Sequence, residues 1–401
     1  MHIQTTVANM PPTNDDGAGL GTDPIPAGPY HREDYFELER EAVFRRSWLN
    51  IGHMAELPEP DSFIVRPVEV LDASLLITRN KEGSLRAFHN VCTHRGTQLV
   101  SESAGKRASF TCPYHAWTFG GDGQLRSAPD FERFHIEKSQ CNLHEVSVAV
   151  CAGLIFVNFD SNNSQSLREY LGPLAEQLET LPVAKATAFS EYTYEINANW
   201  KLTYDNFQEN YHLRFIHPRS GAAAGGPENP FGYPEEYGFY GPHRTQRIWS
   251  NPAPVIKPLQ GFAFGKAAQA AMADGVGGPN GSEYYALFPN FFILGTPMTP
   301  FSHCVMPLGA GKSRGVIRLY WAGPDDSASK RFAREFQMTT ALDVHAEDRA
   351  VIEAGHRGLS SGALEHIHFQ SQEVLCRHFF HTVNNRVEAY KAERRATGGM
   401  A

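Results

Sequence analysis

Two loops, Cys92-Thr93-His94-Arg95-Gly96 and Cys112-Pro113-Tyr114-His115-Ala116-Trp117, each contain one cysteine and one histidine. Two thiolates can hold one iron of a [2Fe–2S] cluster while two imidazoles hold the other iron. Replacing two anionic thiolates by neutral imidazoles raises the potential of such a cluster, to roughly −150 to +300 mV. The sequence therefore predicts a cluster that is bound by Cys92, His94, Cys112 and His115 and that passes on single electrons.

A zinc ion is the alternative occupant of these loops, because two cysteines and two histidines also complete a tetrahedral site. Zinc fingers and ribbons usually pair like ligands, whereas each loop here mixes the two types. Gly96 and Pro113 also suit loops whose backbone packs close to sulfur. We therefore favour a Rieske-type [2Fe–2S] centre and keep a zinc-binding regulatory protein as a hypothesis from another class.

The composition is that of a globular protein. The chain has 401 residues, 41% of them hydrophobic and 11% aromatic, which allows two or three domains. Its 36 basic and 44 acidic residues give a net charge of −8, so no general attraction to nucleic acid or anionic membranes is expected. No stretch approaches the roughly 18 apolar residues of a membrane span, and no secretory signal layout is present. We expect a cytoplasmic protein whose other cysteines are reduced.

Short β-rich runs separated by Gly, Asn, Asp and Pro extend from Trp48 to about Asp160. They predict a small antiparallel β domain. Before this domain, residues 1–30 are expected to form a loose arm and Arg32–Trp48 the first helix. After it, Ser166–Leu181 has helical spacing and leads into a second region.

The second region mixes strands and helices, so the chain as a whole is predicted to be α+β. Strands are expected near Thr187–Asn197, Tyr284–Leu294 and Gly315–Trp321, and a long helix over about Ser327–Leu359. The segment from about Ser220 to Ser282 is rich in Gly, Pro, Ala and aromatic residues. A long segment of this kind predicts a lid or a binding segment.

A second group of potential metal ligands lies in the run from Asn199 to Pro218. Glu209 and His212 are three residues apart, which places them on one face of a helix. His217 follows five residues later, about 140° away on a regular helix. Pro218 disfavours the helical region for the residue before it, so the helix can loosen and His217 can turn back toward His212.

Two imidazoles and one carboxylate on one triangular face leave positions of Fe(II) open for O₂, as in non-haem iron oxygenases. The predicted late helix offers the carboxylate in Glu347-Asp348-Arg349-Ala350-Val351-Ile352-Glu353. Asp348 is favoured because its side chain is short enough to hold a metal rigidly, and Glu347 and Glu353 are its competitors. An electron-transfer cluster upstream strengthens the prediction, because its electrons need an acceptor.

Both motifs resemble those of the Rieske non-haem iron oxygenases, the terminal components of multicomponent oxygenases, from about Trp48 to Leu359. The resemblance implies an N-terminal all-β Rieske domain and a catalytic domain with an antiparallel sheet surrounded by helices, in a helix-grip-like arrangement. The implied boundaries are 1–47 for an arm and helix belonging to the catalytic part, 48–163 for the Rieske domain and 164–401 for the mononuclear iron domain. It also implies a homotrimer that receives electrons from NAD(P)H through a separate reductase, with or without a ferredoxin.

In that family, an acidic residue three positions before the first iron histidine hydrogen-bonds that histidine and the second cluster histidine of the neighbouring subunit. The matching residues here are Glu209, His212 and His115, so Glu209 is expected to link the two centres rather than bind iron. Many members that act on aromatic rings carry Asp there, and the Glu resembles the carnitine and betaine branch. Asn206 matches a family position close to the iron, whereas Lys201 is interpreted as a packing residue.

The resemblance implies a Rieske-type mono- or dioxygenase that uses O₂ to hydroxylate an aromatic or aromatic-acid substrate. One alternative is oxidative C–N cleavage or demethylation of a carnitine- or betaine-like quaternary ammonium compound. Another, from a different class, is a Rieske electron-transfer protein without oxygenase activity. Arg214 is expected either to pair a substrate carboxylate or to make an outward salt bridge. The candidate aromatic lining residues are Phe207, Phe215, Phe262, Phe264, Phe291 and Phe292.

Overall fold

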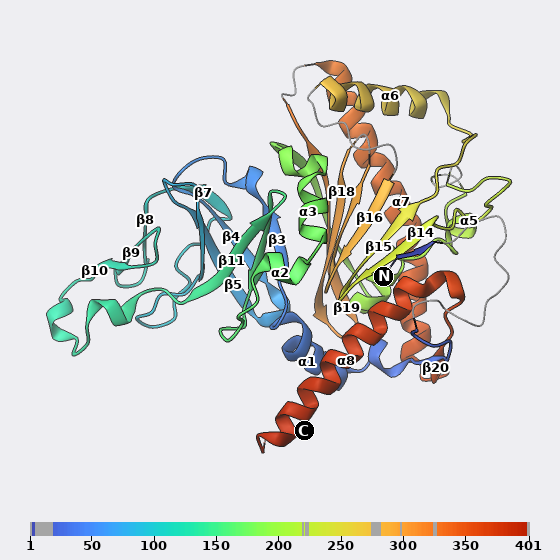
Figure 1. Cartoon of the computed structure of the whole chain (residues 1–401). Helices are drawn as coiled ribbons and strands as arrows, with labels where there is room; N and C mark the ends of the chain where they lie inside the picture. Colours follow the sequence, from blue (N-terminus) through green and yellow to red (C-terminus); the bar gives the residue numbers. More distant parts are fainter. Residues whose placement is uncertain are drawn as a thin grey trace. The chain divides into compact units, whose positions relative to one another are not determined.

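The structure is a computed structural model that describes residues 2–4, 19–218, 220, 224–273, 282–296, 299–323 and 327–398. It divides into two compact units, which are described one at a time (Figure 1). The first comprises Phe44–Tyr170, and the second comprises Met1–Val43 with Leu171–Ala401. Of the N-terminal segment predicted to be a loose arm, residues 5–18 lie outside the described residues.

The first unit is an antiparallel β structure, which confirms the prediction for this region. A seven-stranded sheet has the order β3-β12-β11-β6-β5-β4-β7, and a three-stranded sheet has the order β10-β9-β8. Its strands are β3 (Leu49–His53), β4 (Ser62–Val68), β5 (Ala73–Arg79), β6 (Leu85–His89), β7 (Ala104–Lys106), β8 (Ser109–Thr111), β9 (Thr118–Gly120), β10 (Leu125–Ser127), β11 (Glu145–Cys151) and β12 (Leu154–Asn158). The rings of Phe63, Phe88, Phe110 and Phe119 pack with Cys92 and Cys112 in one core cluster, so the predicted cluster ligands are anchored in the core.

The second unit is built on one eight-stranded sheet of order β1-β14-β15-β16-β17-β18-β19-β13, in which every pairing is antiparallel. Its strands are β1 (His2–Gln4), β13 (Ala188–Ile196), β14 (Glu236–Tyr240), β15 (His243–Ile248), β16 (Ser282–Leu287), β17 (Phe291–Gly295), β18 (Phe301–Gly309) and β19 (Lys312–Trp321). The short strands β2 (Ile25–Pro26) and β20 (His366–Ile367) pair separately. The fold class predicted from the sequence is therefore confirmed.

Helices surround this sheet in the second unit (Figure 1). They are α1 (Glu33–Glu39), α3 (Leu174–Glu179), α4 (Trp200–Asp205), α5 (Leu213–Ile216), α6 (Pro258–Ala273), α7 (Ala328–Ser360) and α8 (Val374–Ala396), while α2 (Leu167–Leu171) crosses the division between the units. The predicted long helix is α7, which packs on β13, where Ile352 joins Ile196 and Ile317 in one core cluster. None of the helices in the described part of the chain is long and apolar enough to cross a bilayer.

Three predicted segments were wrong in detail. The first helix ends at Glu39 and continues as a π-helical segment over Arg40–Phe44, rather than running to Trp48. The helix predicted over Ser166–Leu181 is two short helices, separated at Gly172, which has a φ of 56°. The segment Ser220–Ser282 is largely regular in its described residues, since it contains β14, β15 and α6.

A buried ion pair explains why Lys201 lies at the start of α4. The Lys201 Nζ is 2.6 Å from Oε1 of Glu39, and both side chains are inaccessible to solvent. The indole Nε1 of Trp200 donates to the other oxygen of Glu39 at 2.9 Å. Because a buried charge is costly unless it is paired and hydrogen-bonded, this arrangement ties α4 to α1. The interpretation of Lys201 as a packing residue is consistent with this position.

Candidate iron centres

The two cysteine–histidine loops have the same backbone geometry. Cys92 accepts from the amide of Gly96 at 2.9 Å, and Cys112 accepts from the amide of Ala116 at 3.1 Å. Each cysteine amide in turn donates to the carbonyl five residues later, at 2.8 Å in both loops. Gly96 and Ala116 both have positive φ, 77° and 56°, which closes each loop tightly. The sequence therefore folds into two matching loops that each carry one cysteine and one histidine.

The four predicted cluster ligands converge. The Cys92 and Cys112 side chains are buried. Burial is the main cause that raises the pKa of Cys92, and the neighbouring Cys112 raises it further. The imidazole rings of His94 and His115 have their centroids 4.6 Å apart. The Nδ1 atom of His94 is buried without a hydrogen-bond partner. Two buried thiols beside two adjacent imidazoles, one with an unsatisfied nitrogen, fit the mixed ligand set of a Rieske cluster.

Aromatic residues pack around these loops. The ring of Trp117 stacks on His94 with a centroid distance of 4.8 Å, and Phe134 meets the same imidazole edge-on at 5.5 Å. This packing fixes the orientation of His94. The neighbouring Tyr114 is exposed.

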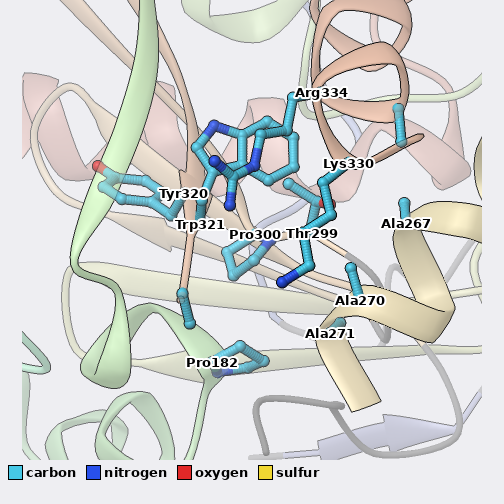
Figure 2. Close-up of a pocket in the computed structure, with 12 residues that line it drawn as sticks. Pro182, Ala267, Ala270, Ala271, Thr299, Pro300, Tyr320, Trp321, Lys330 and Arg334 are labelled. Carbon is cyan, nitrogen blue, oxygen red and sulfur yellow. The ribbon is translucent and has the colours of Figure 1, made fainter. Parts of the chain in front are cut away.

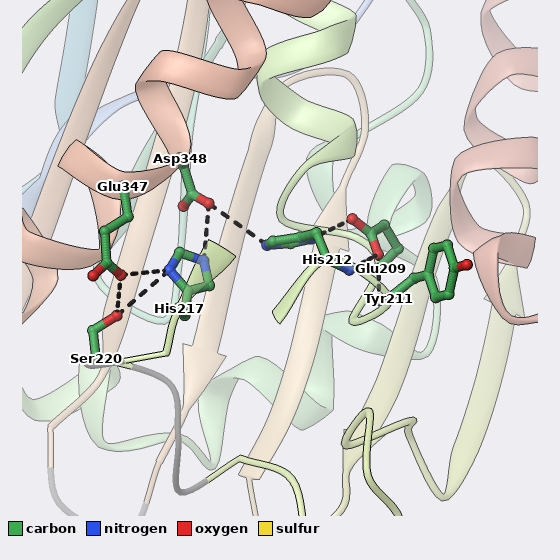
Figure 3. A network of polar contacts seen from close by, with 7 residues as sticks. All are labelled: Glu209, Tyr211, His212, His217, Ser220, Glu347 and Asp348. Atoms are coloured by element: carbon green, nitrogen blue, oxygen red, sulfur yellow. Dashed lines mark hydrogen bonds and ion pairs between the residues drawn. The ribbon is translucent and has the colours of Figure 1, made fainter. Parts of the chain in front are cut away.

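The second centre is formed by His212, His217 and Asp348 (Figure 3). One potential ligand atom from each residue lies within 4.8 Å of the others. The Oδ1 atom of Asp348 is 2.9 Å from Nε2 of His217 and 3.6 Å from Nε2 of His212. Both His217 Nε2 and Asp348 Oδ1 are buried and have no hydrogen-bond partner. A divalent cation bound by this group would satisfy both atoms, so the residues fit a facial site for ferrous iron.

The local backbone differs from the single loosened helix that was predicted. Helix α4 ends at Asp205, and Glu209 lies in an irregular stretch before α5. His212 directly precedes the one-turn helix α5, and His217 directly follows it, in a non-helical conformation with a φ of −110° and a ψ of 50°. The non-helical backbone before Pro218 agrees with the predicted effect of that proline. The two imidazoles therefore meet across one short turn.

Carboxylates outside the three-residue group hold the far nitrogen of each imidazole (Figure 3). Glu209 contacts Nδ1 of His212. The Nδ1 atom of His217 donates to Oε2 of Glu347 at 2.8 Å, and Ser220 donates to the same oxygen. A carboxylate that accepts from the free nitrogen of a ligand histidine fixes the tautomer and orientation of the ring. In both rings Nε2 is thus the atom directed at Asp348.

The competition among acidic residues of α7 is resolved by these contacts. Glu347 lies behind His217, and Glu353 hydrogen-bonds the amide of Asn197, so Asp348 alone faces both imidazoles. Burial lowers the pKa of His217, but the carboxylates of Asp348 and Glu347 outweigh burial and raise it overall. The two carboxylates therefore give this position negative electrostatic surroundings, which also suit a bound cation.

A cavity of about 400 Å³ opens beside this centre, between strands β15–β19 and helices α6 and α7. Its lining is mostly aromatic and aliphatic and consists of Asn206, Phe207, Glu209, Asn210, His212, Leu213, His217, Gln246, Ile248, Phe264, Tyr284, Phe292, Leu294, Thr296, Thr299, Phe301, Ile317, Leu319, Gln337, Thr340, Ala341, Val344, His345 and Asp348. Among these described residues the only charged side chains besides the histidines are Glu209 and Asp348, and none is a lysine or arginine. The cavity thus offers an apolar chamber next to a cluster of metal ligands.

The candidate lining residues divide into two groups. Phe207, Phe264 and Phe292 line the cavity as predicted, and Asn206, which was expected close to the iron, lines it as well. Phe215 and Phe262 are exposed, and Phe291 is buried in β17 outside the lining, so these three predictions were wrong. Arg214 lies outside the lining as well, with its guanidinium 5.8 Å from the ring of Phe231.

Several polar lining residues were not predicted from the sequence, among them Gln246, Tyr284, Gln337 and His345. The strand alternation places Gln246 and Ile248 on one face of β15, which is the signal that could have found the first of them.

A second hollow lies between α6, α7 and the end of β19 (Figure 2). Its volume is about 30 Å³, and one of its lining residues, Arg334, has its guanidinium 5.2 Å from the ring of Trp321. A space of this size has room for about one water molecule, so it is not a substrate site.

Comparison with known families assigns both units. A model of the ring-hydroxylating alpha subunit catalytic domain matches residues 183–389, and a model of the Rieske [2Fe–2S] domain matches residues 47–150. The carnitine monooxygenase oxygenase subunit of Acinetobacter baumannii is 38% identical over 194 residues, 47% of this chain and 51% of that protein. The anthranilate 1,2-dioxygenase large subunit of Acinetobacter baylyi is 31% identical over 193 residues, 46% of this chain and 40% of that protein. The matched part thus spans about half the length of these curated relatives.

Solved structures share the fold. The quaternary ammonium Rieske monooxygenase CntA in complex with L-carnitine superposes with a TM-score of 0.73 at 24% identity, covering 92% of this chain and 97% of that one. Naphthalene 1,2-dioxygenase from a Rhodococcus species superposes with a TM-score of 0.71 at 21% identity, covering 91% and 94%. Since the catalytic model alone matches more than half of the sequence, the chain belongs to the ring-hydroxylating alpha subunit family, and a Rieske [2Fe–2S] domain precedes its catalytic domain.

Proposed function

We propose that this chain is the terminal oxygenase of a multicomponent system and uses O₂ to hydroxylate a neutral, largely apolar ring compound. The observation that carries the proposal is the convergence of His212, His217 and Asp348 on the wall of an apolar cavity of about 400 Å³. Cavities of this size and lining suit small organic ligands. In this proposal Cys92, His94, Cys112 and His115 hold the cluster.

When bound, a cluster held by Cys92, His94, Cys112 and His115 would supply single electrons, and a ferrous ion held by His212, His217 and Asp348 would supply the chemistry for O₂. The protein's own side chains orient the ligands and position the substrate. Glu209 and Glu347 fix the imidazoles of His212 and His217, and the apolar walls keep bulk water away from the substrate. Asn206 lines the cavity with a buried, unpartnered Nδ2, which suits a hydrogen bond at the reacting end.

The charges of the cavity support a substrate without a carboxylate. A carboxylate is costly to bury without a cationic partner, and the described lining residues include no arginine or lysine, while Glu209 and Asp348 would repel it. An aromatic acid is therefore a poorer fit than a neutral ring, and the same holds for the carboxylate of a carnitine-like compound. The rings of Phe207 and Phe292 lie 5.4 Å apart, and those of Tyr284 and Phe292 4.7 Å apart, which suits stacking against a planar substrate.

Oxidation of a quaternary ammonium compound is the second candidate function. It is favoured by the aromatic lining together with two carboxylates, Glu209 and Asp348, because a cation is attracted by both. The matched relatives named as carnitine and glycine betaine monooxygenase subunits point in the same direction. On this reading the product is formed by C–N cleavage or demethylation rather than by ring hydroxylation.

The proposed assembly is a homotrimer in which Glu209 of one subunit links the iron centre to His115 of the next, supplied by an NAD(P)H-dependent reductase in the cytoplasm. Two features support this link: Glu209 lines the cavity beside His212, and both are only partly buried.

The decisive experiment is turnover with a reductase and ¹⁸O₂ on naphthalene, benzoate and choline in parallel. Label in hydroxylated naphthalene supports the first proposal. Formaldehyde or an aldehyde from choline without ring products would favour the second candidate. A third outcome is that the protein contains labile sulfide and the iron of the cluster but no further iron, and gives no product from any probe. The protein would then be an electron carrier.

A further inference from the structure

Two unpaired polar groups lie side by side on the sheet wall of the cavity. Gln246 in β15 and Tyr284 in β16 are directly opposite each other in the strand register, and both line the cavity. Their side chains are 3% exposed in each case. The carbonyl Oε1 of Gln246 and the hydroxyl of Tyr284 are both buried without a hydrogen-bond partner.

Such groups are expensive to bury. An unsatisfied donor or acceptor in an apolar environment loses its hydrogen bonds to water, so buried polar atoms are almost always paired. Here the Gln246 carbonyl, an acceptor, and the Tyr284 hydroxyl, a donor, have no partner at neighbouring positions. Burial raises the pKa of Tyr284 well above its ordinary value, so the hydroxyl keeps its proton and remains a donor at neutral pH.

The rest of the sheet wall is apolar. The lining side chains that the neighbouring strands contribute include Ile248, Phe292, Leu294 and Leu319. The ring of Phe292 packs against Tyr284 with a centroid distance of 4.7 Å. No charged side chain of the described residues lines this wall, since Glu209 and Asp348 come from the loop before α5 and from α7. The lining around Gln246 and Tyr284 therefore favours a neutral substrate group over a charged one.

We propose that Gln246 and Tyr284 are specificity-determining residues that bind a hydroxyl group of the substrate. A hydroxyl accepts from the Tyr284 hydroxyl and donates to the Gln246 carbonyl, which completes both open positions at once. An ether or a ketone satisfies only Tyr284, and a methyl group satisfies neither. This inference deepens the proposed function and rests on it: the preferred substrate is a hydroxylated, otherwise apolar ring compound.

The test uses three probes of nearly equal shape. They are 2-naphthol, which offers a donor and an acceptor, 2-methoxynaphthalene, which offers an acceptor only, and 2-methylnaphthalene, which offers neither. Affinity is measured by titration calorimetry on the iron-loaded trimer without a reductase, so the result does not depend on turnover. We expect 2-naphthol to bind at least about tenfold more tightly than 2-methylnaphthalene, because a site with buried polar groups rejects ligands that leave them unpaired.

Two variants assign the preference to the two side chains. Tyr284→Phe should remove the advantage of 2-methoxynaphthalene over 2-methylnaphthalene and reduce that of 2-naphthol, which still donates to Gln246. Gln246→Met should remove the advantage of 2-naphthol over 2-methoxynaphthalene and leave the rest. Tyr285→Phe is the matched control, because Tyr285 is also buried and adjacent in β16 but lines a different depression. The thermal midpoint and the visible spectrum of each variant report whether it folds and binds its cluster.

The outcomes separate this inference from the function on which it rests. Equal affinities of the three probes, absence of 2-naphthol binding, or a preference of unchanged size in both Tyr284→Phe and Gln246→Met would overturn the assignment of these residues. Oxygenation of naphthalene would still support the proposed function in that case. Conversely, tight and variant-sensitive binding of 2-naphthol without any oxygenated product would support the polar pair while contradicting ring hydroxylation.

Discussion

The Nε2 atom of His217 lies 2.9 Å from Oδ1 of Asp348, and neither atom has a hydrogen-bond partner in the protein. The other nitrogen of His217 is already bonded to Glu347, which leaves Nε2 as the atom available to a metal. The arrangement is that of a metal site whose outer contacts are formed.

Removal of Asp348 should empty the mononuclear site and spare the cluster. Asp348→Ala takes away the carboxylate that faces both imidazoles, so we expect the ratio of iron to labile sulfide to fall from about 3:2 to about 2:2 and the activity to be lost. Metal and sulfide analysis measures the ratio. Asp343→Ala, at an exposed position on the same helix, is the control and should keep the third iron.

Glu209 should affect electron supply more than iron binding. Glu209→Gln keeps the shape but weakens the charge that orients His212, so we expect product formation to fall about 10- to 100-fold with the iron retained. Glu209→Asp tests the length of the side chain and should recover part of the rate. Complete loss of iron from Glu209→Gln would mean that this residue is itself a ligand.

Replacement of a cluster histidine should lower the reduction potential. In His94→Cys a neutral imidazole becomes an anionic thiolate, so we expect the midpoint potential to shift from the Rieske range toward the about −400 mV of all-thiolate clusters. Redox titration followed by visible absorption measures it. His135→Cys adds a cysteine at an exposed position of the same unit and should leave the potential unchanged.

Breaking the buried ion pair should destabilise the second unit. Lys201→Met leaves Glu39 buried without its partner, which costs about 3–5 kcal/mol in free energy of unfolding. Denaturant unfolding provides the measurement. The double variant Lys201→Met with Glu39→Gln should lose less than the sum of the two single changes, and additive losses would argue that the two groups do not interact.

Asp205 should make stability fall with rising pH. Burial raises its pKa to about 7, although Tyr30, Arg244 and Lys201 act in the opposite direction. In the unfolded chain an aspartate titrates near about 3.9, so between about pH 4 and 7 the folded state holds a proton that the unfolded state has lost. The stabilisation is therefore complete below about pH 4 and is lost as the pH rises through about 7, to an extent of up to about 4 kcal/mol.

The comparison of wild type with Asp205→Asn isolates this effect. Urea unfolding at pH 5 and pH 8 should give a smaller pH-dependent difference in the variant, because an amide does not titrate. An unchanged difference would show that Asp205 is ionised across this range.

The iron centres were predictable because their signals are local. Two features depend only on residues close together in the sequence: the matched Cys–His spacing of the loops at Cys92 and Cys112, and the proline after His217. Such features can be interpreted without knowing the tertiary structure. Asp348 required one further step, since the sequence offered three acidic residues on one helix and only the folded register decides which of them faces the histidines.

The cavity wall was less predictable because it depends on pairing between strands. Gln246 and Tyr284 meet only because β15 and β16 align in one register, and the segment that contains β15 was interpreted as a lid. The turn at Gly241 and Pro242, between Tyr240 and His243, was a hairpin signal that went unused. Helix α8 was also missed, although Leu375, Phe379, Val383 and Val387 follow a helical spacing, because its apolar stripe is interrupted by many charges.

The most direct test of the account is electron paramagnetic resonance of the anaerobically reduced protein after exposure to nitric oxide, which binds an open position of ferrous iron. We predict the high-spin signal of a ferrous nitrosyl beside the signal of the reduced cluster, and loss of the nitrosyl signal alone in Asp348→Ala. A fully iron-loaded protein that gives only the cluster signal, or a nitrosyl signal that persists in Asp348→Ala, would contradict it.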